Sequence, residues 1–315
     1  MFTRRLALPA ASLLLLPLAA CGDDASAAGG DEVTVVTSMY PLQYLAERIG
    51  GPDATVVNLT SPGQEPHDLE IGVQQTAELA DADVAVHLAG FQPAVDDALE
   101  QNGPERVVDA ADSADLLAAE EDPEEHAEHE GEEGHDHAAE GADGTDPHFW
   151  LDPERMSSVA AALEEQLAEA DPDNAEAYAA NLTALEDDLG SLAEQMRTGL
   201  ASCETDTIVV SHDAFSYLGT YGIEVAPIAG ISPDAEPSPA RLAELQDVIT
   251  DEGVTTVFYE TLVSPALAET LADGLGIETA VLDPIEGLTD ETEDEDYLSL
   301  MESNLEAIRT ANSCS

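Results

Sequence analysis

Short apolar runs rich in β-branched residues alternate with segments of helical character through most of this chain. The run VTVVT at 33–37, for example, precedes a segment that begins with Pro41 and ends at Gly50, as helices often do. Continuous apolar strands are typical of buried parallel sheets, and their alternation with helices indicates an α/β fold. We expect strands at 33–37, 54–58, 83–88, 106–109, 207–210, 223–227, 255–259 and 278–282. We expect helices between them at 41–50, 73–80, 92–101, 214–221, 239–251 and 265–274, and a last one at 297–311.

Two helical segments with no strand between them interrupt this alternation. Asp152 is a suitable N-cap with Pro153 at the first helical position, so a helix is expected over 153–170. A second helix is expected over 175–200, which is long for a globular protein and lies between two α/β halves. At about 100–200 residues per domain, the 315 residues therefore predict two parallel-sheet lobes joined by this helix. The expected divisions are 32–152 for the first lobe, 153–202 for the helical segment and 203–315 for the second lobe.

The first twenty residues have the features of an export signal. Arg4 and Arg5 precede an apolar run over 6–20, which is too short to span a membrane but fits the core of a secretory signal. The sequence Leu-Ala-Ala-Cys that ends at Cys21 resembles a bacterial lipobox, which implies cleavage before Cys21 and lipid attachment to it. Ordinary cleavage beside an incidental cysteine is the alternative, and the paired arginines leave the export route open. Residues 21–31 are small and polar and are expected to form a flexible tether.

Acidic residues far outnumber basic ones. Asp and Glu total 68 against 8 Lys and Arg, for a formal net charge of −60. A field of this sign repels phosphate backbones and anionic lipids, so nucleic-acid binding is excluded as a function class and cations are the natural small partners. For most of the surface, solubility is the simpler explanation of the acidic residues.

Cys203 and Cys314 are the cysteines that remain besides Cys21. An exported protein folds in an oxidising compartment, where an even pair can form a disulfide. We expect this bridge because Cys314 precedes the last residue, and a free terminus would otherwise fray. Two unpaired thiols are the alternative.

Residues 120–144 break the α/β pattern with twelve Asp or Glu, four His and no large apolar residue. Such a segment cannot bury enough surface to offset its ordering entropy, so it is expected to be a disordered insert in the first lobe. Its histidines could gather cations weakly, and an inert acidic linker is an equally good interpretation. These histidines are His126, His129, His135 and His137.

Three of the other histidines lie at or beyond the ends of expected strands, or at strand-to-helix turns. Parallel sheets bind ligands outside the carboxyl ends of their strands, and Asp283 directly follows the last expected strand. Three imidazoles and one carboxylate make a four-coordinate site that suits Zn²⁺. Each residue also has an ordinary interpretation, as a surface histidine or a turn-forming aspartate. The predicted metal ligands are His67, His148, His212 and Asp283, whereas His87 is expected to be a packed strand residue.

The surroundings of these four residues resemble those in the family of metal-binding lipoproteins that deliver zinc or manganese to ABC importers, the zinc-uptake type above all. The similarity extends from about residue 31 to the C-terminus and includes the stretches ISPDAEPSP and ETLVSP. The ordered set of motifs is specific, whereas any one of them alone would be weak. The four motifs are QEPHDL at 64–69, DPHFWLDP at 146–153, SHDAFSYL at 211–218 and VLDP at 281–284.

The resemblance implies two Rossmann-like α/β lobes bridged by a rigid helix, with the metal in the cleft between them. It also implies an extracytoplasmic, lipid-anchored monomer that captures zinc and passes it to a membrane permease. Manganese members of the family typically have Glu where this chain has His212, and zinc members often carry a His- and acid-rich insert. The alternatives are a manganese-binding homologue and a surface adhesin.

A metal-dependent hydrolase is the rival from a different function class. Catalytic zinc usually keeps one position open for water, whereas four protein ligands close this site. The chain also has neither HExxH nor GxSxG. Glu65 and Glu260 are the acidic residues that a hydrolase could use as a base, and structural roles suit them better. We therefore do not expect an enzyme.

Overall fold

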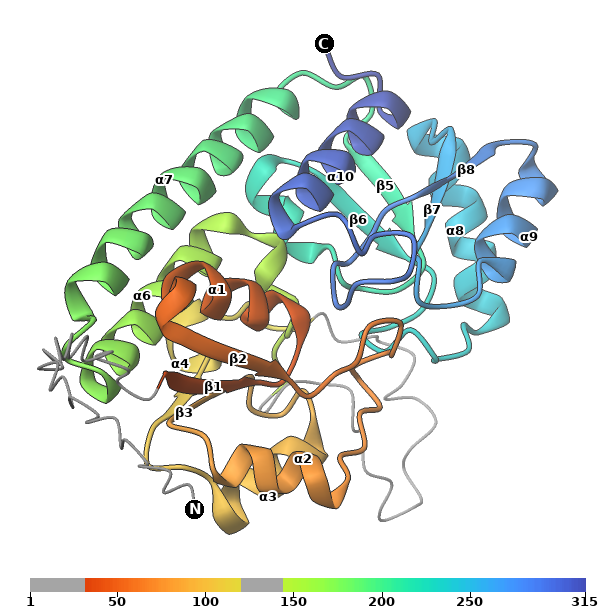
Figure 1. The fold of residues 1–315 in the computed structure, drawn as a ribbon. Coiled ribbons are helices and arrows are strands. Elements are labelled where there is room, and N and C mark those ends of the chain that lie inside the picture. Colours follow the sequence, from red (N-terminus) through yellow and green to blue (C-terminus); the bar gives the residue numbers. More distant parts are fainter. Residues whose placement is uncertain (1–31, 120–143) are drawn as a thin grey trace, which may run out of the picture. The chain divides into compact units, whose positions relative to one another are not determined.

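The computed structural model describes residues 32–119 and 144–315, and these form two α/β lobes (Figure 1). Each lobe contains a four-stranded sheet in which every strand pair is parallel. The fold class predicted from the sequence is therefore confirmed. Several predictions fall outside the described residues: the signal segment, the lipidation site Cys21, the tether over 21–31, and the loop histidines His126, His129, His135 and His137.

The first lobe is built around a sheet with the strand order β2-β1-β3-β4. Consecutive residues of β1 point to opposite faces, and both Val35 and Val36 are fully buried, so both faces of this strand are covered. The VTVVT run is therefore a central strand, as its composition predicted. The strands are β1 (Val33–Thr37), β2 (Ala54–Asn58), β3 (Val84–His87) and β4 (Val107–Asp109). The helices are α1 (Tyr40–Gly50), η1 (Gly51–Asp53), α2 (Val73–Ala80), α3 (Pro93–Asn102) and α4 (Ala111–Ala114).

The second lobe repeats this strand order as β6-β5-β7-β8. One element differs from the sequence prediction, which placed a helix over 214–221. The structure has a six-residue 3₁₀ helix there instead, because Gly222 ends it in the left-handed conformation (φ 84°) and leaves too few residues for a stable α-helix. The strands are β5 (Thr207–Val210), β6 (Glu224–Pro227), β7 (Thr256–Tyr259) and β8 (Glu278–Val281). The helices are η3 (Ser216–Tyr221), α8 (Pro239–Glu252), α9 (Ala266–Leu275) and α10 (Tyr297–Ala311).

Two helices connect the lobes. The short η2 (Phe149–Leu151) leads into α6 (Pro153–Ala170), where the side chain of Asp152 accepts a hydrogen bond from the amide of Glu154, as expected of an N-cap. The long α7 (Ala175–Gly199) contacts α1 of the first lobe and α10 of the second (Figure 1). Domain divisions at 153 and 203 stay a prediction, because the described residues from 32 onward group into one compact unit.

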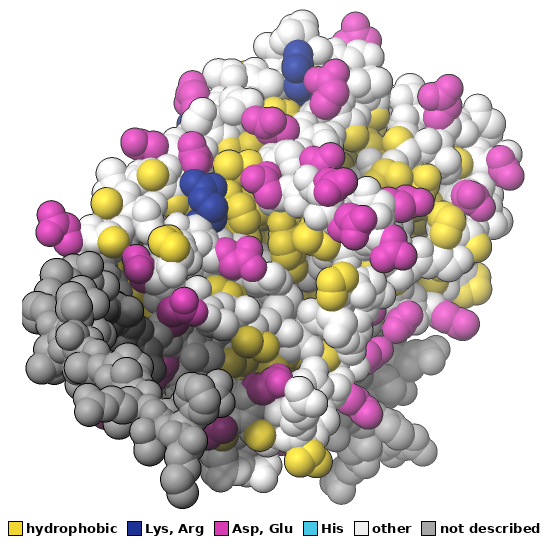
Figure 2. Space-filling view, in the orientation of Figure 1, with side chains coloured by type: hydrophobic (Ala, Val, Ile, Leu, Met, Phe, Trp, Pro, Cys, Tyr) yellow, Lys and Arg dark blue, Asp and Glu magenta, His cyan; other side chains and the backbone are white. Residues whose placement is uncertain are grey.

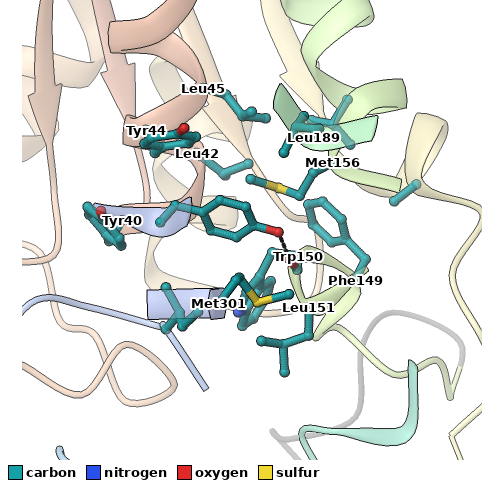
Figure 3. Packing of buried hydrophobic residues seen from close by; sticks show 14 of the residues in the cluster. Tyr40, Leu42, Tyr44, Leu45, Phe149, Trp150, Leu151, Met156, Leu189 and Met301 are labelled. Carbon is teal, nitrogen blue, oxygen red and sulfur yellow. Dashed lines mark hydrogen bonds between the residues drawn. The ribbon is translucent and has the colours of Figure 1, made fainter. Parts of the chain in front are cut away.

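The largest of three hydrophobic clusters in the described residues continues from one lobe into the other. Trp150 and Tyr297 are fully buried within it, and Trp150 lies among side chains of α1, α6 and α10 (Figure 3). The hydroxyl of Tyr297 donates to the carbonyl of Trp150 at 2.6 Å, and the indole N–H of Trp150 donates to the carbonyl of Pro284 at 2.7 Å. These two bonds connect the segment that contains His148 to the start of α10 and to the loop between β8 and α10.

Cys203 and Cys314 form a disulfide, as the sequence predicted. The bridge joins the segment after α7 to the segment after α10. Beside it, the amide of Ser315 donates to the carbonyl of Ser202 at 2.9 Å. The C-terminus is therefore fixed to the second lobe.

The molecular surface is strongly acidic. Figure 2 shows Asp and Glu side chains scattered over the described part of the face in view, with few basic side chains among them. This dispersed distribution agrees with solubility as the main role of the acidic residues. Within 32–119 and 144–315, every helix is either too short or too polar to cross a membrane.

Candidate metal centre

Four buried side chains converge between the two lobes. His67 lies in the loop after β2, His148 directly precedes η2, His212 follows β5, and Glu286 lies in the loop after β8. The exposed fraction is 7% for His67 and at most 1% for the other three. One potential ligand atom from each residue lies within 4.8 Å of all the others. His67, His212 and Glu286 therefore lie in loops that follow the carboxyl ends of parallel strands, whereas His148 lies directly before η2.

The spacing of these atoms matches a tetrahedral metal site. The Nε2 atoms of His67 and His148 each lie 3.4 Å from Oε1 of Glu286, and Nε2 of His212 lies 3.5 Å from it. The Nε2 atoms of His148 and His212 are 3.3 Å apart. Bonds of about 2.0–2.1 Å from zinc to its ligands separate neighbouring ligand atoms of a tetrahedron by about 3.3 Å. These four separations match the edges of a tetrahedron around Zn²⁺, and the ligand atoms of His67 and the other two imidazoles lie within 4.8 Å of one another.

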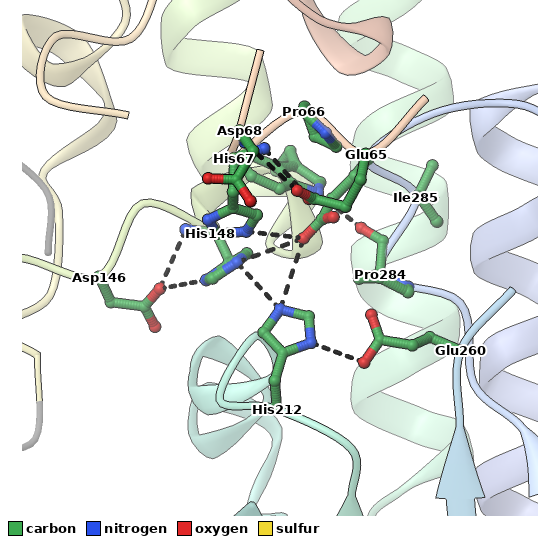
Figure 4. Close-up of polar contacts among 12 residues, drawn as sticks. Glu65, Pro66, His67, Asp68, Asp146, His148, His212, Glu260, Pro284 and Ile285 are labelled. Carbon is green, nitrogen blue, oxygen red and sulfur yellow. Dashed lines mark hydrogen bonds and ion pairs between the residues drawn. The ribbon is translucent and has the colours of Figure 1, made fainter. Parts of the chain in front are cut away.

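Two of the three imidazoles are oriented by carboxylates that bind Nδ1, the ring nitrogen that faces away from the centre. Oδ1 of Asp146 accepts hydrogen bonds from Nδ1 of His148 at 2.8 Å and from its backbone N–H at 3.0 Å. Oε1 of Glu260 accepts from Nδ1 of His212 at 2.7 Å (Figure 4). Because each Nδ1 carries the donated proton, the Nε2 of each ring directs its lone pair at the centre when that ring is neutral.

His67 is oriented by contacts of its own loop as well as by its ring contact with Glu286. Its backbone N–H donates to Oε1 of Glu65 at 3.1 Å, and its ring lies edge-on to Phe91 with the centroids 4.6 Å apart. The same loop contacts the second lobe, where the amide of Gly63 donates to the carbonyl of Leu288 at 2.7 Å. The first-lobe ligand loop and the loop of Glu286 are therefore in direct contact.

The electrostatics of the metal-free site favour a cation. Burial raises the pKa of Glu286, but the three neighbouring imidazoles outweigh this and hold that pKa well below its usual range. Burial lowers the pKa of His212, whereas Glu260 and Glu286 raise it to about 10. Burial likewise lowers the pKa of His148, but hydrogen bonds to Asp146 and Glu286 leave it raised. Glu286 is therefore ionised in the metal-free site, and the neighbouring imidazoles favour a bound positive charge.

Asp283 occupies a different position from the one that sequence analysis gave it. The predicted histidines come together, but Glu286, three residues after Asp283, supplies the carboxylate beside them. Oδ2 of Asp283 accepts from the hydroxyl of Thr261 at 3.0 Å, and Oδ1 accepts from the amide of Ile285 at 2.8 Å. The structure thus brings Glu286, instead of Asp283, to the three imidazoles.

Sequence reasoning did not single out two contributors to the site, Glu286 and Asp146. Asp146 lies two residues before His148, inside a motif already recognised, and this proximity was the available signal. Glu286 had a weaker signal, as one more acidic residue in a loop after a strand end. His87, by contrast, lies outside the cluster, where its Nδ1 pairs with Oδ1 of Asp96 at 3.0 Å.

Known proteins share this fold and sequence over most of the chain. The zinc-binding lipoprotein AdcA of Streptococcus pneumoniae R6 is 34% identical over 313 residues, which cover 97% of this chain and 60% of that protein. This chain thus spans about 60% of the length of that relative. The crystal structure of the Zn(II)-bound ZnuA-like domain of AdcA has a TM-score of 0.71 and 31% identity, covering 89% of this chain and 99% of that domain.

Two further proteins are similar. A high-affinity zinc uptake system protein ZnuA from Bacillus subtilis 168 is 34% identical over 305 residues, covering 93% of each chain. A structure of the laminin-binding adhesin Lmb from Streptococcus agalactiae has a TM-score of 0.76 and 27% identity, covering 89% of this chain and 99% of that one. Residues 35–311 match the model of the family described as the periplasmic zinc-uptake complex component A. The chain therefore belongs to the ZnuA family, the periplasmic component A of zinc-uptake complexes.

Proposed function

We propose that this protein captures Zn²⁺ outside the cytoplasm and delivers it to the permease of an ABC importer. The observation that carries the proposal is the buried set of three imidazoles and one carboxylate at tetrahedral spacing. In this proposal His67, His148, His212 and Glu286 bind the ion. Glu286 takes the role that sequence analysis gave to Asp283.

The ligand chemistry supports zinc over manganese. Three of the four ligand atoms are imidazole nitrogens, which suit Zn²⁺, whereas Mn²⁺ prefers carboxylate and water oxygens. Affinity at a nitrogen-rich site also rises from Mn²⁺ to Zn²⁺. The manganese-binding alternative is therefore the weaker interpretation.

A capture protein explains the enclosed site better than a hydrolase does. Catalytic zinc needs a position open to water, whereas here four protein groups complete the tetrahedron and are almost fully buried. The family is one of solute-binding transport components, which agrees with the sequence prediction that the chain is no enzyme.

Membrane attachment and oligomeric state complete the proposal. A lipid on Cys21 would hold the monomer near its permease, with 21–31 as the tether. The histidines His126, His129, His135 and His137 would bind additional metal more weakly than the buried site, because a segment of this acidic composition with no large apolar residue would lose conformational entropy on being ordered around an ion.

Isothermal titration calorimetry of metal-stripped mature protein without 120–143 tests the proposal. We expect one tight zinc equivalent and much weaker manganese binding. Replacing His67, His148 and His212 together by Ala should abolish tight binding. His87→Ala is the matched control and should leave it unchanged, because His87 pairs with Asp96 outside the cluster.

Three other outcomes would each contradict one part of the proposal. Absence of a tight equivalent in the unmodified site would refute zinc capture and favour an adhesin-type surface role. Manganese affinity equal to that of zinc would refute the assignment of the metal. Loss of tight zinc binding on removal of 120–143 alone would refute the weak, auxiliary role of that segment.

A further inference from the structure

The turn that presents Glu286 has an unusual backbone conformation. Ile285, the residue before Glu286, has φ 59° and is fully buried. β-Branched residues rarely adopt this left-handed region, because their Cβ substituents crowd the backbone. The conformation persists only if surrounding groups hold it, and such strain is concentrated at functional sites.

The carboxylate of Asp283 stabilises this turn through a hydrogen bond with the turn's own backbone. Its Oδ1 accepts the amide hydrogen of Ile285 at 2.8 Å, which forms a local side-chain-to-backbone turn. Its Oδ2 accepts the hydroxyl hydrogen of Thr261 at 3.0 Å. Both oxygens of Asp283 are therefore engaged by neighbouring groups, and the residue has an exposed fraction of only 5%.

Two side chains from other elements, those of Asn304 and Trp150, also form hydrogen bonds with the backbone of this turn. Asn304 of α10 accepts from the amide of Asp283 at 2.9 Å and donates to its carbonyl at 2.6 Å. The indole of Trp150 donates to the carbonyl of Pro284 at 2.7 Å. The residues on either side of Ile285 thus have little freedom, and Glu286 extends from a turn fixed by three separate elements.

We propose that Asp283 is a positioning residue that holds the left-handed turn at Ile285 and thereby aims the carboxylate of Glu286 at His67, His148 and His212. The inference deepens the proposed function and rests on it, since it concerns the same zinc site. In this account Glu286 contacts the metal and Asp283 acts only through the turn.

Isosteric replacement separates positioning from ligation. In Asp283→Asn the amide oxygen still accepts from Ile285, and the amide NH₂ can donate to the hydroxyl oxygen of Thr261. We therefore expect D283N to retain zinc affinity within about threefold of the unmodified protein. D283A removes both contacts and should weaken binding by about 10–100-fold, the range typical of residues that orient metal ligands. E286Q should weaken it more than D283A, because it removes an anionic ligand.

The Co²⁺ absorption spectrum reports the coordination sphere independently of affinity. We expect D283N to give the spectrum of the unmodified protein, and E286Q to give an altered one. If D283N lost affinity as D283A does and also changed the spectrum, Asp283 would be a ligand and the inference would be wrong. D283A binding zinc as tightly as the unmodified protein would equally overturn it.

A crystal structure of metal-free D283A tests the inference even if the protein failed to bind zinc tightly. The account expects Ile285 to leave the left-handed region and Glu286 to move away from the imidazoles. An unchanged turn in D283A would refute positioning by Asp283. Absence of tight zinc binding in the unmodified protein would refute the proposed function instead, so the two failures are distinguishable.

Discussion

The Nε2 atoms of His148 and His212 face each other at 3.3 Å in the buried centre between the lobes. Each ring donates its Nδ1 proton to a carboxylate behind it, so both Nε2 lone pairs would point inward if both rings were neutral. Two lone pairs at this distance repel each other unless a cation lies near them. In the metal-free protein a proton on the imidazole of His212 removes this repulsion, which agrees with the pKa of His212 being raised to about 10. Zinc would replace that proton.

Zinc binding should therefore release protons at neutral pH. Because the pKa of His212 is raised to about 10, this ring is protonated below that pH in the metal-free protein, and zinc must displace the proton. We expect zinc affinity to fall steadily as pH decreases from about 9 to 6, by up to tenfold per pH unit for each proton displaced. Calorimetry at pH 7.5 in buffers of different ionisation enthalpy measures the number of protons released. Binding heats that did not depend on the buffer would contradict this prediction.

The carboxylates behind the imidazoles should strengthen zinc binding without touching the metal. Glu260→Gln keeps a hydrogen-bond acceptor for Nδ1 of His212 but removes the charge, so the imidazole becomes a poorer ligand. We expect about a tenfold loss of zinc affinity, and the same for Asp146→Asn. Competition with a chelator of known affinity measures it. Asp96→Asn makes the same change beside His87, outside the site, and should have no effect; equal losses in all three variants would point to a general charge effect.

Trp150 should report zinc binding through its fluorescence. It is the only tryptophan of the chain, it is fully buried, and its ring centroid lies 5.2 Å from that of His148. Exchange of a proton for zinc at His148 and His212 changes the field at the indole, so we expect the emission to change and to saturate at one zinc equivalent. Emission that stayed constant, or kept changing well beyond one equivalent, would disagree with a single site beside this ring.

The disulfide should contribute to stability and not to metal binding. Cys203 and Cys314 are 111 residues apart in sequence, and closing a loop of that length stabilises a fold by up to about 4–5 kcal/mol in the chain-entropy model. We expect the double replacement by Ser to lower the free energy of unfolding in urea, while the zinc stoichiometry stays at one. Unfolding midpoints that were the same with and without the bridge would contradict this expectation.

Much of the fold was predictable because its strands carry strong local signals. The run at 33–37 is strand β1 in the structure, and the helix expected over 153–170 is α6. The three histidines could be proposed because each lies at or beyond the end of an expected strand or at a strand-to-helix turn, where parallel sheets bind ligands. Their spacing carries no pattern, so the resemblance of the surrounding motifs to a metal-binding family was also needed to place them in one site.

The fourth ligand of the site could not be identified from the local sequence. Asp283 and Glu286 lie three residues apart in one loop, and the direction in which each points depends on Ile285. A β-branched residue disfavours the left-handed conformation that Ile285 adopts, so local propensity argued against the turn that exists. The bond from Asp283 to the amide of Ile285, together with contacts to Thr261 after β7 and Asn304 of α10, stabilises this turn.

X-ray absorption spectroscopy at the zinc edge tests the central claim most directly. For protein without 120–143 loaded with one zinc equivalent, the account predicts four ligand atoms at about 2.0–2.1 Å, with the scattering pattern of three imidazoles and one carboxylate oxygen. Glu286→Gln should alter the oxygen contribution, and Asp283→Asn should not. A spectrum with fewer than three imidazoles, or one changed by Asp283→Asn and not by Glu286→Gln, would contradict the site described here.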